Sequence, residues 1–501
     1  MPDQPNILFI LSDQMTAALT GAYGHPVVQT PNLDRLAREG VRFDAAYTPF
    51  PLCAPGRACL MTGRHASEIG AWDNGALLPA DQLTFAHYLA NAGYDTVLSG
   101  KMHFIGPDQL HGFRRRLTTD IYSADFNWVR PEWIRIKETQ GRDCEDVMGE
   151  RARYNALGYT AEGVRVGMWH NPLSYDEETH FRALEYLRAQ GHKKGENPFL
   201  LCASYHHPHE PFWPPQEYWD LYENAEIDIP EFPESLDASY SMMDRNLNAY
   251  HGTRRYDLRD PDGLYRLRRA YYAQVTYTDR KVGELLDALV ANGLADTTVV
   301  VFSSDHGDML CEKEMVQKRC FYERACRVPL LARFPDGWMA GASCPTPVSL
   351  VDLLPTFCEL AGVKAMRPHD GDSLLPLLEG AEEDRVIFAQ AHEAVGMPCI
   401  MARQGRFKYH YIHGYEPQLF NLEADPGEWR NLAEDPACRE TAGALRSRIL
   451  TRFDPDAMAQ ENLQSLYRRH TIWNTMSKQG HTWAHFPHFD ARRGAMDQYL
   501  P

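Results

Sequence analysis

The chain has 501 residues, of which 44% are hydrophobic and 11% aromatic, and these proportions indicate a globular protein with a substantial core. Its formal net charge of -17 at pH 7 argues against a nucleic-acid partner, because phosphate binding needs a basic surface. The one compact basic run, Arg114-Arg115-Arg116, is better explained as a solvated loop. No stretch is long and apolar enough to cross a membrane, so we expect no membrane partner.

The apolar run NILFIL at residues 6–11 lacks a basic leader and is followed by Asp13 rather than by a small-residue cleavage site. It predicts a buried strand and not a signal peptide. The eleven cysteines are an odd number and lie scattered, mostly in apolar segments. Because no export signal precedes them, we expect reduced thiols and a cytoplasmic location.

Helix-like and strand-like segments alternate after this first strand. In residues 30–47, a proline at the expected start, leucines at helical spacing and Gly40 as a stop predict a helix. Residues 83–101 repeat the plan, with Gly93 ending a helix before a strand at 95–100.

Two later segments continue the alternation. Residues 197–211 predict a strand that runs into a histidine-rich loop, and residues 279–308 predict a helix, a glycine turn and an apolar strand. Such alternation is typical of parallel strands covered by helices on both faces. The predicted fold class is therefore α/β, with a large, mostly parallel sheet sandwiched by helices.

Three regions follow from these patterns. We expect residues 1–375 to form one α/β domain, and the short strands and turns of residues 376–450 to form a small C-terminal α+β subdomain with an antiparallel sheet. Residues 451–501 carry Trp473, Trp483 and little periodicity. This predicts an extended aromatic tail that serves in oligomerisation or in contacts to the substrate pocket, because so aromatic a segment is rarely left in water.

Polar side chains follow four of the predicted strands, and ligands of such sheets gather at the carboxyl ends of the strands. These side chains are Asp13 with Gln14, Lys101 with His103, His207 with His209, and Asp305 with His306. In the second and third pairs the residues are two apart, so in an extended segment they face the same way. We therefore expect one shared site.

The residue types in this site suit a metal and an oxyanion. Asp13, Asp305 and His306 can supply oxygen and nitrogen ligands to one divalent cation, with Gln14 adding a neutral oxygen. Taken alone, Asp305 is also explained as the cap of a following helix, and Lys318 is as well explained by a surface position as by an anion contact. Together with histidines and lysines, the metal suits a tetrahedral sulfate or phosphate.

The stretch PLCAPGRACLMTGRHA at residues 51–66 supplies the missing nucleophile. Its Cys53-Ala54-Pro55-Gly56-Arg57 resembles the Cys-x-Pro-x-Arg signature of type I sulfatases, in the alkaline phosphatase superfamily. TPNLDRLAREGVRF, SGKMH, SSDHGD and LFNLEADPGEWRNLAED extend the resemblance over most of the chain. It implies an alkaline-phosphatase-like fold, and a Cys53 converted to the nucleophile formylglycine by a formylglycine-generating enzyme.

Within that family the chain is most similar to choline sulfatases, above all in LSGKMHFIGPDQLHGFRRRLTTDIYSADFNW. The resemblance implies a metal shell of Asp13, Gln14, Cys53, Asp305 and His306. It implies that Cys53, as formylglycine, is the nucleophile. It also implies that the sulfate is held and protons are moved by Arg57, Lys101, His103, His207 and Lys318.

Substrate choice is expected to depend on three further residues. A quaternary ammonium group favours an aromatic face and a nearby carboxylate, and Trp128 and Glu393 match these positions in choline sulfatases. We place His209 beside them as a substrate-binding residue. Two departures from the family pattern are Gly56, where serine or alanine is usual, and the short C-terminal tail, in which Asp497 is the one candidate for the family's polar contact to choline.

The predicted activity is hydrolysis of an alkyl sulfate ester, with choline-O-sulfate first. The alternatives are another alkyl or aryl sulfatase, a phosphonate monoester hydrolase or phosphodiesterase with the same nucleophile, and a metal- or anion-binding protein whose Cys53 is never modified. Ca²⁺ suits the oxygen ligands best, while His306 leaves Mn²⁺ or Mg²⁺ open. We expect a homo-oligomer, a dimer or a tetramer.

Overall fold

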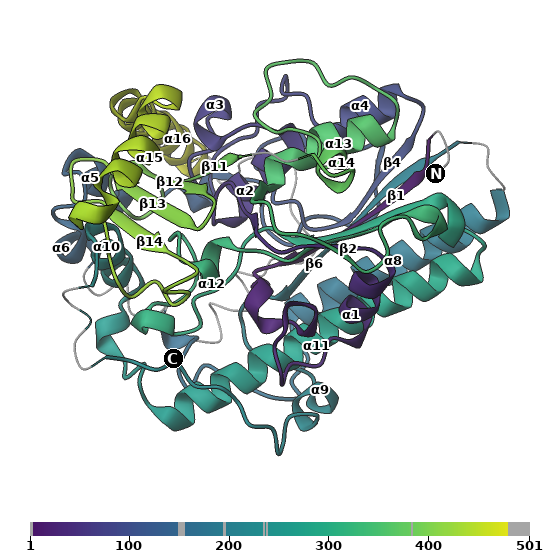
Figure 1. Cartoon of the computed structure of the whole chain (residues 1–501), viewed down its shortest axis with the longest axis horizontal. Coiled ribbons are helices and arrows are strands. Elements are labelled where there is room, and N and C mark those ends of the chain that lie inside the picture. Colours follow the sequence, from purple (N-terminus) through teal and green to yellow (C-terminus); the bar gives the residue numbers. More distant parts are fainter. Residues whose placement is uncertain are drawn as a thin grey trace.

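A computed structural model describes residues 4–148, 156–193, 197–233, 236, 239–381 and 384–478, with an eight-stranded sheet at the centre (Figure 1). In spatial order its strands are β5 (Arg115–Arg116), β4 (Asp95–Gly100), β6 (Phe199–Pro208), β1 (Asn6–Asp13), β7 (Thr298–Ser304), β8 (Leu330–Arg333), β2 (Val41–Phe43) and β9 (Ala342–Cys344). Only β8 runs antiparallel to its neighbours β7 and β2. The predicted mostly parallel sheet is therefore confirmed.

The central strand β1 explains why the sheet is covered on both faces. Every residue from Ile7 to Leu11 is fully buried. Successive side chains of a strand point to opposite faces, and here Phe9 packs in one apolar cluster while its neighbours Leu8 and Ile10 pack in another. A strand that is apolar on both sides needs a helical layer against each of them.

Helices supply these two layers (Figure 1). One face carries α1 (Pro31–Glu39), α8 (Asn171–Lys193) and α11 (Pro261–Ala291), and the other carries α2 (Cys53–Thr62), α4 (Phe85–Asn91) and α13 (Leu353–Leu360). The two helices predicted in the early chain are α1, which ends before Gly40, and α4, which is followed by Gly93 with a φ of 96°. Glycine adopts such a positive φ without steric cost.

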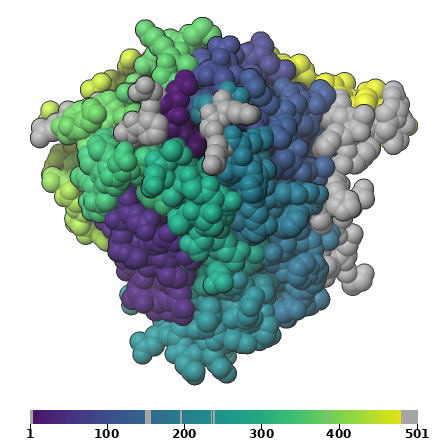
Figure 2. All heavy atoms as spheres, turned by 90° about the vertical axis from the view of Figure 1, so that its right-hand side faces the viewer, coloured from purple at the N-terminus to yellow at the C-terminus, as the bar shows by residue number. Residues whose placement is uncertain are grey.

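Shorter elements complete the described part of the chain. They are α3 (Ala66–Ile69), α5 (Pro131–Glu138), α6 (Cys144–Met148), α9 (Gln216–Asp220), α10 (Met242–His251), α12 (Glu323–Cys326), α14 (Leu375–Leu378) and a two-stranded sheet of β3 (Ala46–Tyr47) and β10 (Val348–Ser349). Segments from the beginning, middle and later parts of the chain share one continuous surface (Figure 2). Among the residues described, no helix combines the length and the apolar character needed to cross a membrane.

A second sheet lies in the C-terminal part of the chain. Its four antiparallel strands are β11 (Val386–Ala391), β12 (Cys399–Gln404), β13 (Phe407–Ile412) and β14 (Gln418–Asn421). Helix α15 (Arg439–Arg452) covers this sheet, because its Leu445 and Ile449 are buried against Ile400 and Tyr409. The antiparallel sheet expected in residues 376–450 is present.

The tail differs from its predicted extended form over the part that is described. Residues Pro455–Lys478 form helix α16, whose buried Arg469 pairs with Asp73 through Nη1–Oδ1 and Nη2–Oδ2 distances of 2.6 and 2.8 Å. Trp473 Nε1 donates a hydrogen bond of 2.8 Å to Asn127 Oδ1. These contacts attach the helix to the main body, whereas residues 479–501, with Trp483 and Asp497, lie outside the described residues.

The end of β4 depends on a glycine. Gly100 has a φ of 105°, and a Cβ atom built there would lie 1.9 Å from the carbonyl oxygen of Ser204 on β6. The missing side chain lets the two strands approach, and Lys101 N then donates a hydrogen bond of 2.9 Å to the same carbonyl. The glycine therefore fixes where the chain leaves the sheet at Lys101.

We expect Gly100→Ala to lower the free energy of unfolding by about 3 kcal/mol, because the new methyl group meets a backbone carbonyl. Gly93→Ala is the matched control: its φ of 96° is similarly strained for alanine, but no atom lies within 4 Å of the added Cβ. That variant should lose about 1 kcal/mol. Urea unfolding measures both values, and equal losses would contradict the close approach of β4 to β6.

Candidate active site

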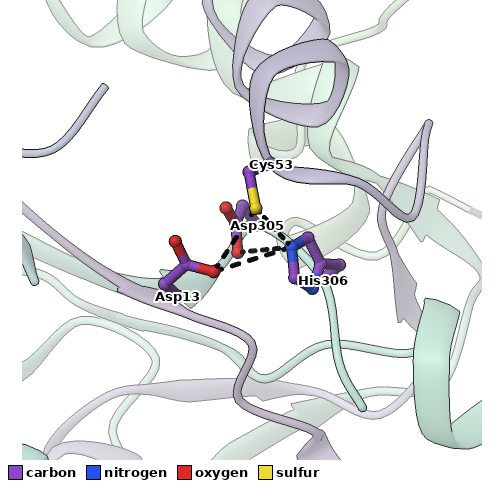
Figure 3. Close-up of side chains that lie close together, drawn as sticks. All are labelled: Asp13, Cys53, Asp305 and His306. Carbon is purple, nitrogen blue, oxygen red and sulfur yellow. Dashed lines mark hydrogen bonds and ion pairs between the residues drawn. The ribbon is translucent and has the colours of Figure 1, made fainter. Parts of the chain in front are cut away.

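Four buried side chains converge at the carboxyl edge of the central sheet (Figure 3). Asp13 ends β1, Asp305 and His306 follow β7, and Cys53 is the first residue of α2. One ligand atom from each lies within 4.8 Å of the others. Figure 3 shows all four pointing toward a shared centre, although they come from three separate segments.

Strand register brings the two carboxylates together. Parallel pairing places Ser12 of β1 opposite Ser304 of β7, so the next residues, Asp13 and Asp305, leave the sheet side by side. Asp305 N donates a hydrogen bond of 3.3 Å to the carbonyl of Ser12. Gln14 N donates one of 3.2 Å to Asp305 Oδ1. The structure therefore places these two strand ends side by side, as the sequence predicts.

Two cations hold the carboxylates. Arg57 Nε lies 2.7 Å from Asp305 Oδ2, its Nη2 lies 3.4 Å from Asp13 Oδ2, and the ammonium of Lys101 pairs with Asp13 Oδ2. Arg57 Nη1 also donates to the carbonyl of Lys101 at 2.7 Å and to Ser204 Oγ at 2.8 Å. Since all four charged groups are fully buried, each carboxylate needs its cation to offset the cost of desolvation.

The environment fixes the protonation of the cluster. Burial alone would raise the pKa of Asp13, but the charges of Lys101 and Arg57 lower it well below its usual value. Burial lowers the pKa of His306 to about 4, so its imidazole is neutral at pH 7. Burial also raises the pKa of the Cys53 thiol to about 12. Deprotonated carboxylates and a neutral imidazole are the forms that bind divalent cations.

Gln14, expected as a metal ligand, has its amide held from several sides. Its oxygen accepts a hydrogen bond from Lys318 Nζ, and its nitrogen donates to Glu210 Oε2 at 2.7 Å and to Asp308. In the structure, Asp308 therefore accepts a hydrogen bond from the side-chain amide of Gln14. Lys318 is 3% exposed, which removes the alternative of a surface lysine.

Glycine at position 56, a departure from the usual signature, fits the packing of α2. A Cβ atom at Gly56 would lie 2.8 Å from the carbonyl oxygen of Phe50 and 3.3 Å from that of Asp305. The helix that begins at Cys53 therefore lies unusually close to the chain before it and to the end of β7. A larger residue at position 56 would push α2, and with it Cys53, away from Asp13, Asp305 and His306.

The structure separates the two histidines that were expected to face the same way. His209 Nε2 lies 2.9 Å from Lys318 Nζ, and its Nδ1 lies 2.9 Å from the carbonyl of Glu210. His207 instead pairs through Nδ1 with Asp176 Oδ2 of α8, at 2.6 Å. His207 lies inside β6 and faces the helix layer, whereas His209 lies beyond the strand end. Of these two histidines, only His209 contacts a cation of the site, namely Lys318.

The ring of His103 packs against two aromatic side chains. Its ring centroid lies 4.7 Å from that of Tyr122 and 5.0 Å from that of Trp128, and neither ring nitrogen has a hydrogen-bond partner among the described residues. Asp120 Oδ2 accepts hydrogen bonds from the backbone nitrogens of Met102 and His103, at 2.9 and 2.7 Å. This carboxylate holds His103 at its unusual φ of 59°.

Sequence reasoning missed Asp120, Tyr122 and Asp176. The first two lie in the LTTDIY stretch, which was noticed only for its resemblance to known proteins. Asp176 lies within a long helix, and no pattern in the sequence links it to His207. The spacing of residues along the chain carries no signal for such contacts.

Glu393 has both carboxylate oxygens engaged. Its Oε1 lies 2.9 Å from Arg319 Nε and 2.8 Å from Arg319 Nη2, and its Oε2 accepts a hydrogen bond of 2.9 Å from Asn74 N. Asn74 Oδ1 in turn accepts one of 3.0 Å from Ala54 N, next to Cys53. The carboxylate expected beside a substrate cation therefore has an internal cation as its partner.

Comparison with known families gives two matches. The family model described as Sulfatase matches residues 5–363, and one described as N-sulphoglucosamine sulphohydrolase, C-terminal, matches residues 311–454. Together they span both sheets of the structure.

Individual proteins are similar along nearly the whole chain. Choline-sulfatase of Rhizobium meliloti (strain 1021) is 37% identical over 497 residues, which cover 97% of this chain and 94% of that protein. Arylsulfatase of Clostridium perfringens (strain 13 / Type A) is 28% identical over 480 residues, which cover 90% of this chain and 95% of that protein.

Solved structures share the fold. The phosphonate monoester hydrolase of Agrobacterium radiobacter has a TM-score of 0.69 at 24% identity, covering 89% of this chain and 95% of that one. The phosphonate monoester hydrolase SpPMH from Silicibacter pomeroyi has a TM-score of 0.71 at 24% identity, covering 90% and 95%. The expected large sheet with a smaller C-terminal sheet is thus a known architecture.

We expect Ca²⁺ to raise the melting temperature, because a ligand that binds only the folded state stabilises it by about 2.7 kcal/mol at 100 times its Kd. Asp13→Asn, which removes one charged oxygen of the cluster, should abolish most of this shift. Asp120→Asn is the control, since it alters a buried carboxylate outside the cluster. Differential scanning calorimetry with and without Ca²⁺ measures the shifts. An equal shift in the Asp13→Asn variant would contradict a metal site here.

Proposed function

Because this chain belongs to the sulfatase family and hydrolyses sulfate esters, we propose that its substrate is an alkyl sulfate, with choline-O-sulfate as the first candidate. The choline-sulfatase relative, similar over 97% of the chain, supports that choice. The products would be the alcohol and sulfate.

The observation that carries the proposal is the convergence of three buried cations, Arg57, Lys101 and Lys318, on the cluster around Cys53. Asp13 and Asp305 pair with Arg57 and Lys101, and the carboxylate of Glu210 balances the charge of Lys318. A divalent cation held by Asp13, Asp305 and His306 would make the net charge of the site positive. Buried charges are poorly screened, so these cations support an oxyanion site next to the cysteine, which a sulfate ester would fill.

We propose that Cys53 acts as formylglycine, made by a formylglycine-generating enzyme. The unmodified thiol, with its pKa raised by burial to about 12, is protonated at pH 7 and is a weak nucleophile. Formylglycine supplies a hydrated aldehyde: one hydroxyl attacks sulfur while the bond between sulfur and the alcohol oxygen breaks. The second hydroxyl then loses its proton, re-forms the aldehyde C=O and expels sulfate by breaking the C–O bond. Arg57 and Lys101, which both pair with Asp13, would hold the sulfate oxygens during both events.

The donor set at the cluster fits one divalent cation. Asp13, Asp305, His306 and position 53 would hold it, with the Gln14 oxygen adjacent, and the ion would polarise a sulfate oxygen. Two carboxylates among these ligands favour Ca²⁺, and the imidazole also allows Mn²⁺ or Mg²⁺.

Lys318 and His209 form the proposed acid. Burial would lower the pKa of Lys318, but the charge of Glu210 raises it above its usual value, so the amine is protonated. Burial and Lys318 together lower the pKa of His209 well below its usual value. A protonated lysine that donates to a neutral imidazole at 2.9 Å can pass a proton to the departing alcohol. The contacts favour His209 over His207 for this role.

His103 is the proposed base for sulfate release. Burial and the charge of Lys101 lower its pKa well below the usual value, so the ring is neutral and able to accept a proton. The flanking rings of Tyr122 and Trp128 exclude water from this side, and we propose that the same rings contact the alkyl group. Aromatic faces also suit the quaternary ammonium of choline.

The cellular setting is part of the proposal. Each of the eleven cysteines is a free thiol, which supports a reducing, cytoplasmic location. We also propose a homo-oligomer, a dimer or a tetramer, whose size can be measured by light scattering.

The test of the proposed function is a substrate panel on protein whose aldehyde has been confirmed by peptide mass. We expect kcat/KM on choline-O-sulfate to exceed that on 4-nitrophenyl sulfate and on a phenylphosphonate monoester by roughly tenfold or more, because the buried acid serves an alkoxide leaving group. Cys53→Ser, the control, should lose turnover on all three. A preference for the aryl sulfate or the phosphonate would contradict the alkyl sulfate proposal.

We expect the two histidines to differ sharply when each is replaced by asparagine. Asparagine keeps a donor near the position of Nδ1 but removes Nε2, so His209→Asn loses the contact to Lys318 while His207→Asn can keep its bond to Asp176. On choline-O-sulfate, kcat should fall roughly 100- to 10,000-fold for His209→Asn. It should stay within roughly a factor of ten for His207→Asn. The reverse order would assign the proton to His207.

A further inference from the structure

A buried ion pair lies beside the cysteine helix, between Arg319 and Glu393. The two guanidinium nitrogens Nε and Nη2 lie 2.9 and 2.8 Å from Glu393 Oε1. The side chains are 8% and 2% exposed. At this depth each charge depends on the other, because an isolated buried charge is strongly disfavoured.

Both members of the pair are linked by hydrogen bonds to the segment that contains Cys53. Arg319 directly follows Lys318 in the chain, and its backbone nitrogen donates a hydrogen bond of 2.9 Å to the carbonyl of Pro51. Glu393 reaches the start of α2 through Asn74, which accepts a hydrogen bond from Ala54 N. The pair therefore lies beside the segment that carries Cys53, where its net charge can act on the alcohol part of a sulfate ester bound at the site.

Arg319 is fixed in this position. Its Nη1 donates a hydrogen bond of 2.6 Å to Gln317 Oε1, and its guanidinium lies 5.4 Å from the ring centroid of Tyr250. A trimethylammonium group has no N–H donors, so it cannot replace the two directed bonds that Arg319 makes to Glu393. A substrate cation would instead meet a carboxylate whose charge is already neutralised.

We infer that Arg319 is a specificity-determining residue that cancels the charge of Glu393, so that this site accepts neutral alkyl sulfates about as well as cationic ones. The inference rests on the proposed function and assigns its substrate class: alkyl sulfates recognised by shape and aromatic contact rather than by an ammonium charge. Choline-O-sulfate is one member of that class. The charge-sensing carboxylate is present in the chain but is held by an internal cation.

The test compares choline-O-sulfate with 3,3-dimethylbutyl sulfate, in which carbon replaces the ammonium nitrogen. The quantity measured is the ratio of kcat/KM for the cationic ester to that for the neutral one. In the natural protein we expect this ratio to lie within about threefold of unity.

A cycle of three variants separates the two charges. Arg319→Met leaves Glu393 unpaired and should raise the ratio about tenfold, as expected for one unit charge several ångströms from the ammonium. Glu393→Gln leaves Arg319 unpaired and should lower the ratio by a similar factor. The double variant removes both charges and should return the ratio to within about threefold of the natural value. A purely structural pair would change both substrates equally.

Two further measurements keep the result interpretable if a single variant folds poorly. Arg319→Lys retains the charge and should retain the ratio, and the charge-free double variant leaves no buried ion alone. Calorimetric affinities for both esters, measured in a Cys53→Ala background, give the same ratio without turnover. If no alkyl sulfate is turned over, the proposed function fails, while these affinities still decide the role of Arg319.

Three results would overturn the inference. The first is a natural ratio of about thirtyfold or more in favour of choline-O-sulfate, because Glu393 would then sense the cation despite its partner. The second is a ratio that stays constant through the whole cycle. The third is a double variant whose ratio stays at the Arg319→Met value instead of returning.

Discussion

The structure depends on keeping two carboxylates, Asp13 and Asp305, charged in a place that water does not reach. Parallel strands deliver them side by side, and without Arg57 and Lys101 they would repel each other at the centre of the molecule. The glycines at 56 and 100 serve the same arrangement, since each permits a close backbone approach that brings a cation-bearing segment to the carboxylates. At this edge of the sheet, the close packing of the backbone and the pairing of the buried charges therefore depend on each other.

Much of the fold could be predicted, because its signals are local. Strand β1 is apolar at every position from Ile7 to Leu11, and this pattern alone indicates a strand buried on both faces. The meeting of Asp13 with Asp305 followed from a rule about the ends of parallel strands. Helix α16 was not predicted, because its apolar residues form no clear stripe. Its position depends on Arg469 and Asp73, which lie almost 400 residues apart.

The details of the site were less predictable, because they depend on contacts between distant residues. Spacing suggested that His207 and His209 face the same way, but β6 ends at Pro208 and only the second histidine lies beyond the sheet. Glu393 could be matched to a cation-binding position, but its partner Arg319 is 74 residues away in sequence and left no pattern. The sequence thus predicted which strand ends and loops meet at this edge of the sheet, whereas the partners of the individual side chains are visible only in the three-dimensional structure.

The burial of Cys53 sets an order of events for the living protein. Its side chain is 1% exposed, and all of α2 is buried, so an enzyme that must grip residues 53–57 cannot reach them once the fold has closed. Arg469, which fixes the loop beside this helix, is among the last described residues to leave the ribosome. If the proposed maturation holds, oxidation of Cys53 must therefore be complete before folding buries the residue, so the two processes compete kinetically. Growth conditions that speed folding relative to oxidation would leave a correctly folded but inert fraction.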